Sequence, residues 1–454
     1  MPKVSIIMPS LNVVKYIEQC MESVINQTLK DIEIIAVDAG STDGTLEILR
    51  KYELHDNRVQ IIHADKKSYG YQVNLGISVA NGDYIGIVET DDYIDLKMYE
   101  TLYTLAVESK ADYVKGSAVR FLGLTGDRKY CTKIEVFTVK EFAQHNGLIT
   151  INPSVTPELI LKDYYLWTGI YRNDFAKSIL LNQTPGAAYQ DIGFLLQTFC
   201  KAKKAVYIDK IFYYYRQDNP SASGYNPKAF HFLVQEYKHV DNLLQGQDEK
   251  WHALSYCKMF RQTNQRIRLM AISGVFWDSA ISDLKNISDK LKVAISTNEI
   301  AAENLTAKEW AELDLIVQNP RELYEYHKTA ETERCGKLSI LLEKISAADQ
   351  IVVFGCGILG NFVLALLDLN GIDKIGAYCD NNSDLWKKDL QGKPIISPAQ
   401  AVQDYPNGTY IVANRTHCQE IKKQLVGMGI SDDNIYEYTL GADPILLNKI
   451  YLNS

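Results

Sequence analysis

Three polar segments, each directly after an apolar run, carry the side chains that could do chemistry in this chain. They are residues 9–12, 38–45 and 89–92, all within the first hundred residues. If the apolar runs are neighbouring parallel strands, their carboxyl ends meet at one edge of an open α/β sheet, where such sheets bind ligands. Carboxylates gathered at that edge suit a divalent cation that holds a nucleoside diphosphate.

The third segment, Glu89-Thr90-Asp91-Asp92, has the most specific pattern. Side chains alternate between the two faces of a strand, so Glu89 and Asp91 are predicted to point the same way. Two carboxylates that converge at a strand end can hold Mg²⁺ or Mn²⁺, with diphosphate oxygens completing the octahedron. We expect Asp91 to be the principal metal ligand, with Glu89 and Asp92 as further candidates. Without the other two segments, such an acidic group would indicate only a solvated loop.

Alternating strands and helices over residues 3–115 are predicted to position these segments. The alternation indicates a mainly parallel sheet, because apolar runs of strand length are separated by one-faced helical patterns. Asn12 is predicted to cap the first helix, and Ser41 or Thr42 the second. The predicted strands are residues 4–8, 32–37, 59–63 and 84–88, and the predicted helices are 17–25, around 46–52 and around 71–80.

The rest of the chain is expected to complete this first domain and to add two more parts. Residues 116–225 are more irregular and belong to the first domain, 1–225. Residues 226–345 carry long helical patterns with little Gly or Pro and are predicted to be a helical extension and connector. A fresh α/β unit, 346–454, follows as a small Rossmann-like accessory domain, with strands at 350–355, 374–379, 409–413 and 434–438 and helices at 358–369 and 418–428.

Composition and charge exclude several classes of protein. The net charge of −8 argues against broad nucleic-acid binding, which needs a basic face. The eight cysteines are scattered without a CxxC pair, which fits reduced thiols in a cytosolic protein. No run reaches the roughly 18 to 20 apolar residues of a membrane span, and no signal-peptide pattern precedes the first strand. We therefore expect a cytoplasmic protein, and leave open its peripheral association with the inner face of the cell membrane and its assembly into a homo-oligomer.

The order and spacing of these segments resemble the inverting nucleotide-sugar glycosyltransferases of family 2, which have the GT-A fold. The resemblance covers the predicted first domain and implies Mn²⁺ or Mg²⁺ at the family's Asp-x-Asp motif, where Glu89 replaces the first acid. It places Pro9 and Asn12 beside the nucleotide. It also assigns Asp38 to the uracil or ribose, with turn capping as the alternative role. The family's second acid at this place is Ala39 here.

The resemblance implies further contacts with the donor and the acceptor. Asn74 matches a family Asn on the donor side, and Thr90 is a further donor-binding candidate. Arg216 ends an aromatic strand and either pairs with the diphosphate or forms a structural salt bridge. The Ser-rich loop that follows, residues 220–223, could order over the donor. Trp167 lies where the family builds part of the acceptor pocket, with a core position as the alternative.

An inverting transfer needs one general base, which removes the proton of the acceptor hydroxyl. By resemblance this base is Asp191, just before an apolar helix at residues 192–199, and helix capping is the alternative role. No nucleophile is required, because no covalent intermediate forms. Two residues depart from the family's pattern: Gln190 stands where an acid is usual, and Gln72 stands where Arg is usual.

A second motif, Gly355-Cys356-Gly357-Ile358-Leu359-Gly360, follows a predicted strand and opens a helix, and Asp380 ends the next predicted strand. That context meets the criteria for dinucleotide binding. The unit has only about 100 residues, however, enough for half a dinucleotide fold, and it lacks a Tyr-x-x-x-Lys set for hydride chemistry. It resembles small domains of sugar-modifying enzymes that bind a nucleotide sugar or serve as structural modules. We expect an accessory role without redox catalysis, with NAD-dependent chemistry as the alternative.

Together these observations predict a metal-dependent glycosyltransferase. It would move a sugar from a nucleoside diphosphate, with UDP expected, to a hydroxyl of a glycan or lipid-linked acceptor in bacterial surface polysaccharide synthesis. A sugar-phosphate nucleotidyltransferase shares the sheet architecture but needs a Gly-rich, Arg-containing loop after the first strand, which residues 9–12 are not. A non-catalytic nucleotide-sugar-binding or scaffold protein is the remaining alternative, and the acids Asp91 and Asp191 argue against it.

Overall fold

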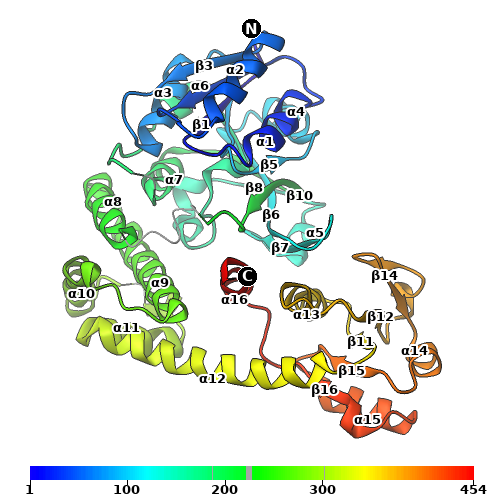
Figure 1. Ribbon diagram of the computed structural model, residues 1–454. Coiled ribbons are helices and arrows are strands. Elements are labelled where there is room, and N and C mark those ends of the chain that lie inside the picture. The colour runs from blue at the N-terminus through cyan, green and yellow to red at the C-terminus, as the bar shows by residue number, and fades with distance from the viewer. Residues whose placement is uncertain (187, 221–227, 301, 454) are drawn as a thin grey trace. The chain divides into compact units, whose positions relative to one another are not determined.

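The computed structural model describes residues 1–186, 188–220, 228–300 and 302–453. The chain forms two compact units (Figure 1). The first contains residues 1–120, 133–267 and 276–323, and the second contains residues 121–132, 268–275 and 324–454. No helix in the described ranges combines the length and the apolar character needed to cross a membrane.

The predicted parallel sheet forms one half of the first unit. Its strands follow the order β3-β2-β1-β4, and every neighbouring pair in this half is parallel. The bounds lie close to those predicted: β1 (Val4–Ser10), β2 (Ile32–Asp38), β3 (Val59–His63) and β4 (Tyr84–Ile87), with helices α1 (Ile17–Ile25), α2 (Thr45–His55) and α3 (Tyr69–Val79) between them.

An antiparallel half extends this sheet beyond β4 and accounts for the irregular pattern of residues 116–225. β9 (Gly169–Arg172) lies between β4 and β6 (Tyr113–Gly123) and is antiparallel to both. β10 (Ala205–Arg216) follows and pairs antiparallel with β5 and β8. The remaining elements are β5 (Tyr93–Ile94), β7 (Lys129–Ile134), β8 (Leu148–Ile151), α4 (Met98–Ser109), α5 (Val139–Gln144), α6 (Asn173–Lys177) and α7 (Gln190–Lys201).

The caps predicted for the first two helices are wrong. α1 begins only at Ile17, and Asn12 adopts a left-handed conformation in which its Oδ1 accepts from the Thr42 amide at 2.9 Å. Ser41 Oγ in turn accepts from the Asn12 amide at 3.0 Å. These polar side chains therefore join the loops after β1 and β2 to each other, which competes with capping because the same oxygens are used.

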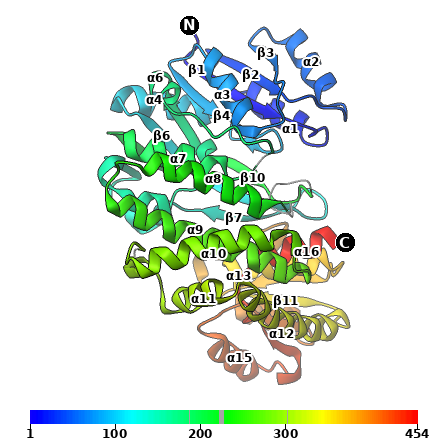
Figure 2. The same cartoon turned by 90° about the vertical axis from the view of Figure 1, so that its left-hand side faces the viewer.

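Long helices follow the sheet, as predicted for residues 226–345. They are α8 (Ala229–Leu244), α9 (Glu249–Ser273), α10 (Ile281–Ser296), α11 (Ala307–Gln318) and α12 (Pro320–Ser346). Figure 2 shows α7 and α8 side by side. Glu236 Oε1 of α8 accepts from the Gly193 amide of α7 at 2.8 Å, and a Cβ atom on Gly193 would lie 2.6 Å from this oxygen. The glycine therefore allows α8 to approach the first turn of α7.

The second unit contains a separate sheet with strand order β13-β14-β12-β11-β15-β16. The neighbouring strands from β14 to β16 in this order are parallel to each other. Successive residues of β11, such as Val352 and Val353, belong to hydrophobic cores on opposite faces of the sheet. A parallel sheet buried on both faces is typical of α/β units. Its elements are β11 (Ile351–Phe354), β12 (Ile375–Cys379), β13 (Asp389–Leu390), β14 (Lys393–Ile396), β15 (Thr409–Val412), β16 (Ile435–Glu437), α13 (Ile358–Leu369), α14 (Pro398–Asp404), α15 (Cys418–Gly427) and α16 (Pro444–Asn453).

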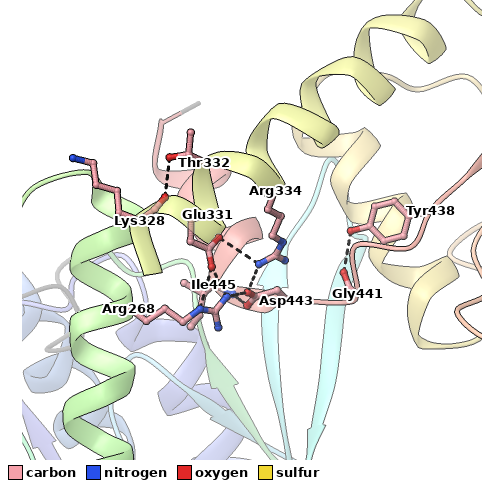
Figure 3. Close-up of polar contacts among 9 residues, drawn as sticks. All are labelled: Arg268, Lys328, Glu331, Thr332, Arg334, Tyr438, Gly441, Asp443 and Ile445. Atoms are coloured by element: carbon pink, nitrogen blue, oxygen red, sulfur yellow. Dashed lines mark hydrogen bonds and ion pairs between the residues drawn. The ribbon is translucent and has the colours of Figure 1, made fainter. Parts of the chain in front are cut away.

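Asp443 joins three segments of the second unit (Figure 3). Its Oδ2 accepts from Arg268 and, at 2.6 Å, from Arg334 Nη1, and its Oδ1 accepts from the Ile445 amide in the first turn of α16. Glu331 binds Arg268 at 2.8 Å and completes the network. Burial by itself would raise the pKa of Asp443, but the two guanidinium groups outweigh it and hold that pKa below its usual range.

We expect Asp443→Ala to destabilise the second unit by about 3 kcal/mol, because removing one partner of a half-buried ion pair leaves the other charge uncompensated. Urea unfolding followed by circular dichroism measures the effect. Glu333→Ala, an exposed change on α12, is the control and should lie within about 0.5 kcal/mol of the natural protein. Equal stability of the two variants would show that the network is energetically neutral.

Candidate active site

A cavity of about 430 Å³ lies in the first unit, and the predicted polar segments 9–12 and 89–92 contribute to its lining. Its walls come from the loop after β1, the segment after β4, the first turns of α3 and α7, residues 165–167, the end of β10 and one side chain of α9. Nine residues singled out from the sequence line it: Pro9, Asn12, Gln72, Glu89, Thr90, Asp91, Trp167, Gln190 and Asp191. The first and third segments therefore lie around one space, as expected from strand ends at one edge of a sheet, whereas no residue of the second segment, 38–45, lines it.

The acidic group lies in a turn and not in a continuation of β4. The strand ends at Ile87, and the Asp92 amide donates to the Glu89 carbonyl at 3.0 Å, which closes a turn. Glu89 and Asp91 both line the cavity, but they lie in a turn, so the strand alternation from which they were predicted to point the same way does not apply. Asp92 is fully buried, and its Oδ1 accepts from the Arg216 amide at 2.7 Å.

Burial and mutual repulsion disfavour the charged form of these acids. Burial raises the pKa of Glu89 to about 8, and the charges of Asp91 and Asp191 act in the same direction. Burial also raises the pKa of Asp91, against a hydrogen bond from Asn219 Nδ2 at 2.8 Å. The pKa of Asp92 lies well above its usual range because of burial and the two neighbouring acids. An added cation would stabilise all three in the charged form.

A divalent cation fits this arrangement. Ligand oxygens of Glu89, Asp91 and Asp92 all lie within 4.8 Å of one another, about twice a metal–oxygen distance of roughly 2.0–2.6 Å. Carboxylate oxygens are the ligands that Mg²⁺ and Mn²⁺ prefer. Because Glu89 and Asp91 also line the cavity, an ion held there would be within reach of a ligand in the same space.

Asp191 reaches the cavity from the first turn of α7. The N-cap of α7 is Tyr189 in a left-handed conformation, φ 66°, so Asp191 is not the cap. Glu236 binds the Gly193 amide in the same turn and thereby fixes it. Burial raises the pKa of Asp191 to about 6, against the charge of Lys258. A carboxylate with this pKa can act as a base near neutral pH.

Known proteins resemble the chain in both sequence and structure. The family model described as Glycosyl transferase family 2 matches residues 5–161, and the model described as C2185-like, N-terminal, matches residues 347–436. Glycosyltransferase GlyG of Streptococcus pneumoniae serotype 4 is 33% identical over 228 residues, which are 48% of this chain and 72% of that protein. The uncharacterized glycosyltransferase EpsJ of Bacillus subtilis is 31% identical over 245 residues, 52% of this chain and 68% of that protein.

The chain belongs to glycosyltransferase family 2. Among solved structures, S. aureus TarS 1–349 in complex with UDP-GlcNAc is 19% identical, with a TM-score of 0.53 over 73% of this chain and 92% of that chain. This likeness confirms the GT-A fold that the resemblance of the N-terminal segments implied.

Two residues of this glycosyltransferase that were predicted to bind the donor contact their own chain. Asp38 is buried, and its Oδ2 accepts from the amides of Gly40 and Ser41 at 2.9 and 3.0 Å. Asn74 exchanges two hydrogen bonds, of 2.9 and 3.0 Å, with the backbone of Leu181. Neither residue is among those that line the described cavity. Their donor contacts stay predictions, while turn capping, the alternative role of Asp38, is present.

Arg216 connects the end of β10 to the acidic turn. Its Nε donates to the Asp91 carbonyl at 2.7 Å, its Nη1 lies 3.1 Å from Asp218 Oδ1, and its Nη2 donates to Gln19. The structural salt bridge, predicted as the alternative to diphosphate binding, is therefore present in this glycosyltransferase. The Ser-rich loop at residues 221–223 lies outside the described residues.

The two glutamines that depart from the family's pattern tie backbone segments together. Gln72 Nε2 donates to the carbonyls of Ser10 at 2.9 Å and Val37 at 2.7 Å, which joins the carboxyl ends of β1 and β2. Gln190 Oε1 accepts from the Gly70 amide at 2.8 Å, which joins α7 to α3. Both are buried, so neutral amides serve here without the desolvation cost of a charge.

Trp167 is a core residue and a part of the cavity wall at once. Only 4% of it is exposed, and its ring stacks on Tyr213 with centroids 4.0 Å apart. Tyr165 and Tyr215, which also line the cavity, lie 4.7 and 5.2 Å from the same ring. The wall next to Trp167 is therefore aromatic, and its contact with an acceptor stays a prediction.

No site residue was predicted in the helical connector, yet α9 contributes to the cavity. Arg266 lines it, with its guanidinium 5.0 Å from the centre of the Tyr189 ring, and burial lowers the pKa of Arg266 to about 10. Lys258 lies buried two turns earlier. The available signal was Lys258, Gln262 and Arg266 at i, i+4 and i+8, which puts three polar residues on one face of the helix.

The glycine motif of the second unit is explained largely by its own turn. Gly355 has φ 110°, and a Cβ atom on Gly360 would lie 1.9 Å from the Gly355 carbonyl oxygen. Asp380 accepts from the amides of Cys356 at 3.0 Å and Asn382 at 2.9 Å. These contacts require the two glycines and engage the acid, so a nucleotide site at Gly355, Gly357, Gly360 and Asp380 stays a prediction.

We expect Gln72→Leu to lower the free energy of unfolding by about 2 kcal/mol and to weaken donor binding, because two buried carbonyls at the cavity edge lose their donor. Thermal unfolding and calorimetry with UDP measure the two effects. Ser78→Ala, an exposed change on the same helix, serves as the control. If Gln72→Leu is as stable as the natural protein, the two carbonyls accept hydrogen bonds from water instead.

Proposed function

We propose that the chain is an inverting, metal-dependent glycosyltransferase that moves a sugar from UDP to a hydroxyl of a glycan or lipid-linked acceptor in bacterial surface polysaccharide synthesis. One observation carries this proposal. Glu89 and Asp91, a pair suited to a cation, line the same cavity as Asp191, a carboxylate suited to be a base. A single-step transfer requires both groups at one place, since the acceptor must lose its proton as the diphosphate leaves.

Glu89 and Asp91 would hold the cation, with Asp92 buried behind them. When bound, a divalent cation neutralises the diphosphate and stabilises it as a leaving group. The protein holds the Asp91 side of this site in place from two directions: Arg216 Nε binds the Asp91 carbonyl, and Asn219 Nδ2 binds its carboxylate. Both partners lie at or after the end of β10, so the sheet itself supports the turn.

Asp191 would accept the proton of the acceptor hydroxyl while the oxygen attacks the anomeric carbon. Attack from the side opposite the diphosphate inverts the configuration at that carbon, and no covalent intermediate is needed. Gln190 and Glu236 support this role, because they fix the first turn of α7 from α3 and α8. A carboxylate held on a rigid helix can keep the geometry that proton transfer requires.

The choice of donor and acceptor has support from relatives. S. aureus TarS, which shares the fold, was solved with UDP-GlcNAc. Chondroitin synthase of Escherichia coli is 40% identical over 94 residues, 21% of this chain and 14% of that protein. A bacterial polymer as acceptor is consistent with these relatives. Work at the cytoplasmic face of the cell membrane, where lipid-linked acceptors are available, belongs to the same proposal.

Asp91→Ala should abolish the Mn²⁺-dependent part of UDP binding and reduce sugar transfer or donor hydrolysis by about 10²-fold or more, because one of the two cavity-facing acids is lost. Calorimetry with UDP, with and without EDTA, measures the binding. Glu108→Gln, an exposed change on α4, is the control for net charge. Unchanged metal-dependent affinity in Asp91→Ala would rule out this cation site.

Asp191→Asn should lower kcat by roughly 10²-fold or more while UDP binding survives, since shape is kept and basicity is lost. In the natural protein kcat/KM should rise with pH through about 6, because the base must be deprotonated and burial raises its pKa to that value. Rates measured between pH 5 and 8.5 check this. Full turnover by folded Asp191→Asn would exclude the base role. Metal-dependent UDP binding without turnover of any UDP- or GDP-sugar by the natural protein would favour the scaffold alternative.

A further inference from the structure

Lys258 is a buried cation whose ammonium has no hydrogen-bond partner in the described part of the chain. Only 1% of the residue is exposed. The ammonium lies 4.5 Å from the centre of the Tyr164 ring, which stabilises a cation weakly compared with the loss of water. Burial of an unpaired charge destabilises the folded protein. We therefore expect an opposite charge close enough to stabilise it.

α9 carries both Lys258 and a residue of the cavity lining. Lys258 and Arg266 are eight residues apart, close to the same face of the helix, and Arg266 lines the cavity. Tyr164, whose ring contacts Lys258, is flanked by two residues of the same region. Tyr165 lines the cavity, and Asp163 is buried. Lys258 therefore lies beside residues next to the cavity lining, on the helix that contributes Arg266 to the same cavity as Asp191.

The neighbouring charges leave Asp191 as the counter-charge of Lys258. Asp163 is occupied by Lys115, whose Nζ lies 2.7 Å from Asp163 Oδ2, and by the Tyr207 hydroxyl, which donates to the same oxygen at 3.0 Å. Lys115 is fully buried and repels Lys258. With this pair satisfied, Asp191 is the acid that attracts Lys258 without an ion pair of its own among the described residues.

We propose that Lys258 is a positioning residue of the transfer reaction: its buried ammonium keeps Asp191 ionised, so that the carboxylate can accept a proton. The proposal rests on the role of Asp191 as the base. It also gives the helical connector a role in the reaction, because α9 supplies the positive charge that stabilises the ionised base.

The other charges around Asp191 act against its ionisation or are weaker. Glu89 and Glu236 are acids that interact unfavourably with it. Burial raises the pKa of Asp191, and among the groups that oppose burial Lys258 is the largest, ahead of the amides of the first helical turn and of Lys115. Burial also lowers the pKa of Lys258 to about 8, so the ammonium is charged throughout the range where Asp191 titrates.

Lys258→Met removes the charge and keeps most of the volume. We expect the acidic limb of the kcat/KM profile to move up by about one pH unit, so that activity falls roughly eightfold at pH 5.5 and lies within about twofold of the natural protein at pH 8.5. Thermal stability should be equal or higher, because an apolar residue replaces a buried charge. Lys258→Arg should restore the acidic limb, and Lys238→Met, an exposed change on α8, should leave it unchanged.

A readout independent of turnover separates this inference from the proposed function. The carboxyl ¹³C signal that disappears in Asp191→Asn reports the titration of Asp191, and Lys258→Met should shift its midpoint upward by about one unit. An unchanged midpoint, or a loss of activity equal at all pH values, would overturn the role of Lys258. If the natural protein transfers no sugar but the midpoint shifts, the electrostatic coupling stands and the catalytic role falls. Should Lys258→Met fail to fold, the midpoint in Lys258→Gln decides: it must move upward, because this side chain stays polar but loses the charge.

Discussion

Repulsion among three neighbouring carboxylates, one buried and two at the cavity wall, is the constraint on which the first unit depends. Glu89, Asp91 and Asp92 have ligand oxygens within 4.8 Å of one another, a spacing that is unfavourable in a low-dielectric interior. The protein holds them with dipoles: the Tyr213 hydroxyl accepts from the Glu89 amide, and the Arg216 amide and Asn219 side chain donate to the two aspartates. These contacts fix the acids without cancelling their charge. The antiparallel half of the sheet is needed because β10 or the segment after it supplies all three.

The same sheet edge gives a fourth acid a different environment. Burial disfavours the charge of both Glu89 and Asp191, yet the pKa reaches about 8 for the first and about 6 for the second. The difference follows from the neighbours, since other acids surround Glu89 whereas Lys258 and helix amides oppose the burial of Asp191. Carboxylates with separated pKa values in one cavity can take separate roles, one group as ligands of a cation and the other as a proton acceptor.

Local sequence was enough to predict the parallel strands of the first sheet, the helices between them and the acids, but not the antiparallel strands or the partners of the polar side chains. Ile17 and Leu49 lie in helices whose apolar spacing is visible in the sequence. By contrast, Gln72 binds carbonyls 62 and 35 residues away, and Arg216 binds Asp91 across 125 residues. Such pairs depend on which strands become neighbours. The left-handed conformation of Asn12 was missed for a related reason, since its partner Thr42 belongs to another loop.

The two sides of the site differ in how the chain encodes them. The cation side is built from strand ends within the first hundred residues, so its motifs are short and easily read. The side that holds Asp191 is assembled from α7, α8 and α9, with Glu236 fixing the helix turn and Arg266 reaching the cavity. Helical faces carry a weaker sequence signal than strand-end motifs, because i, i+4 spacing of polar residues is common on any exposed helix. If the donor binds at the acids and the acceptor at Asp191, changes in the connector would alter the choice of acceptor and leave the donor site intact. The helices after the sheet would then set acceptor specificity within a constant fold.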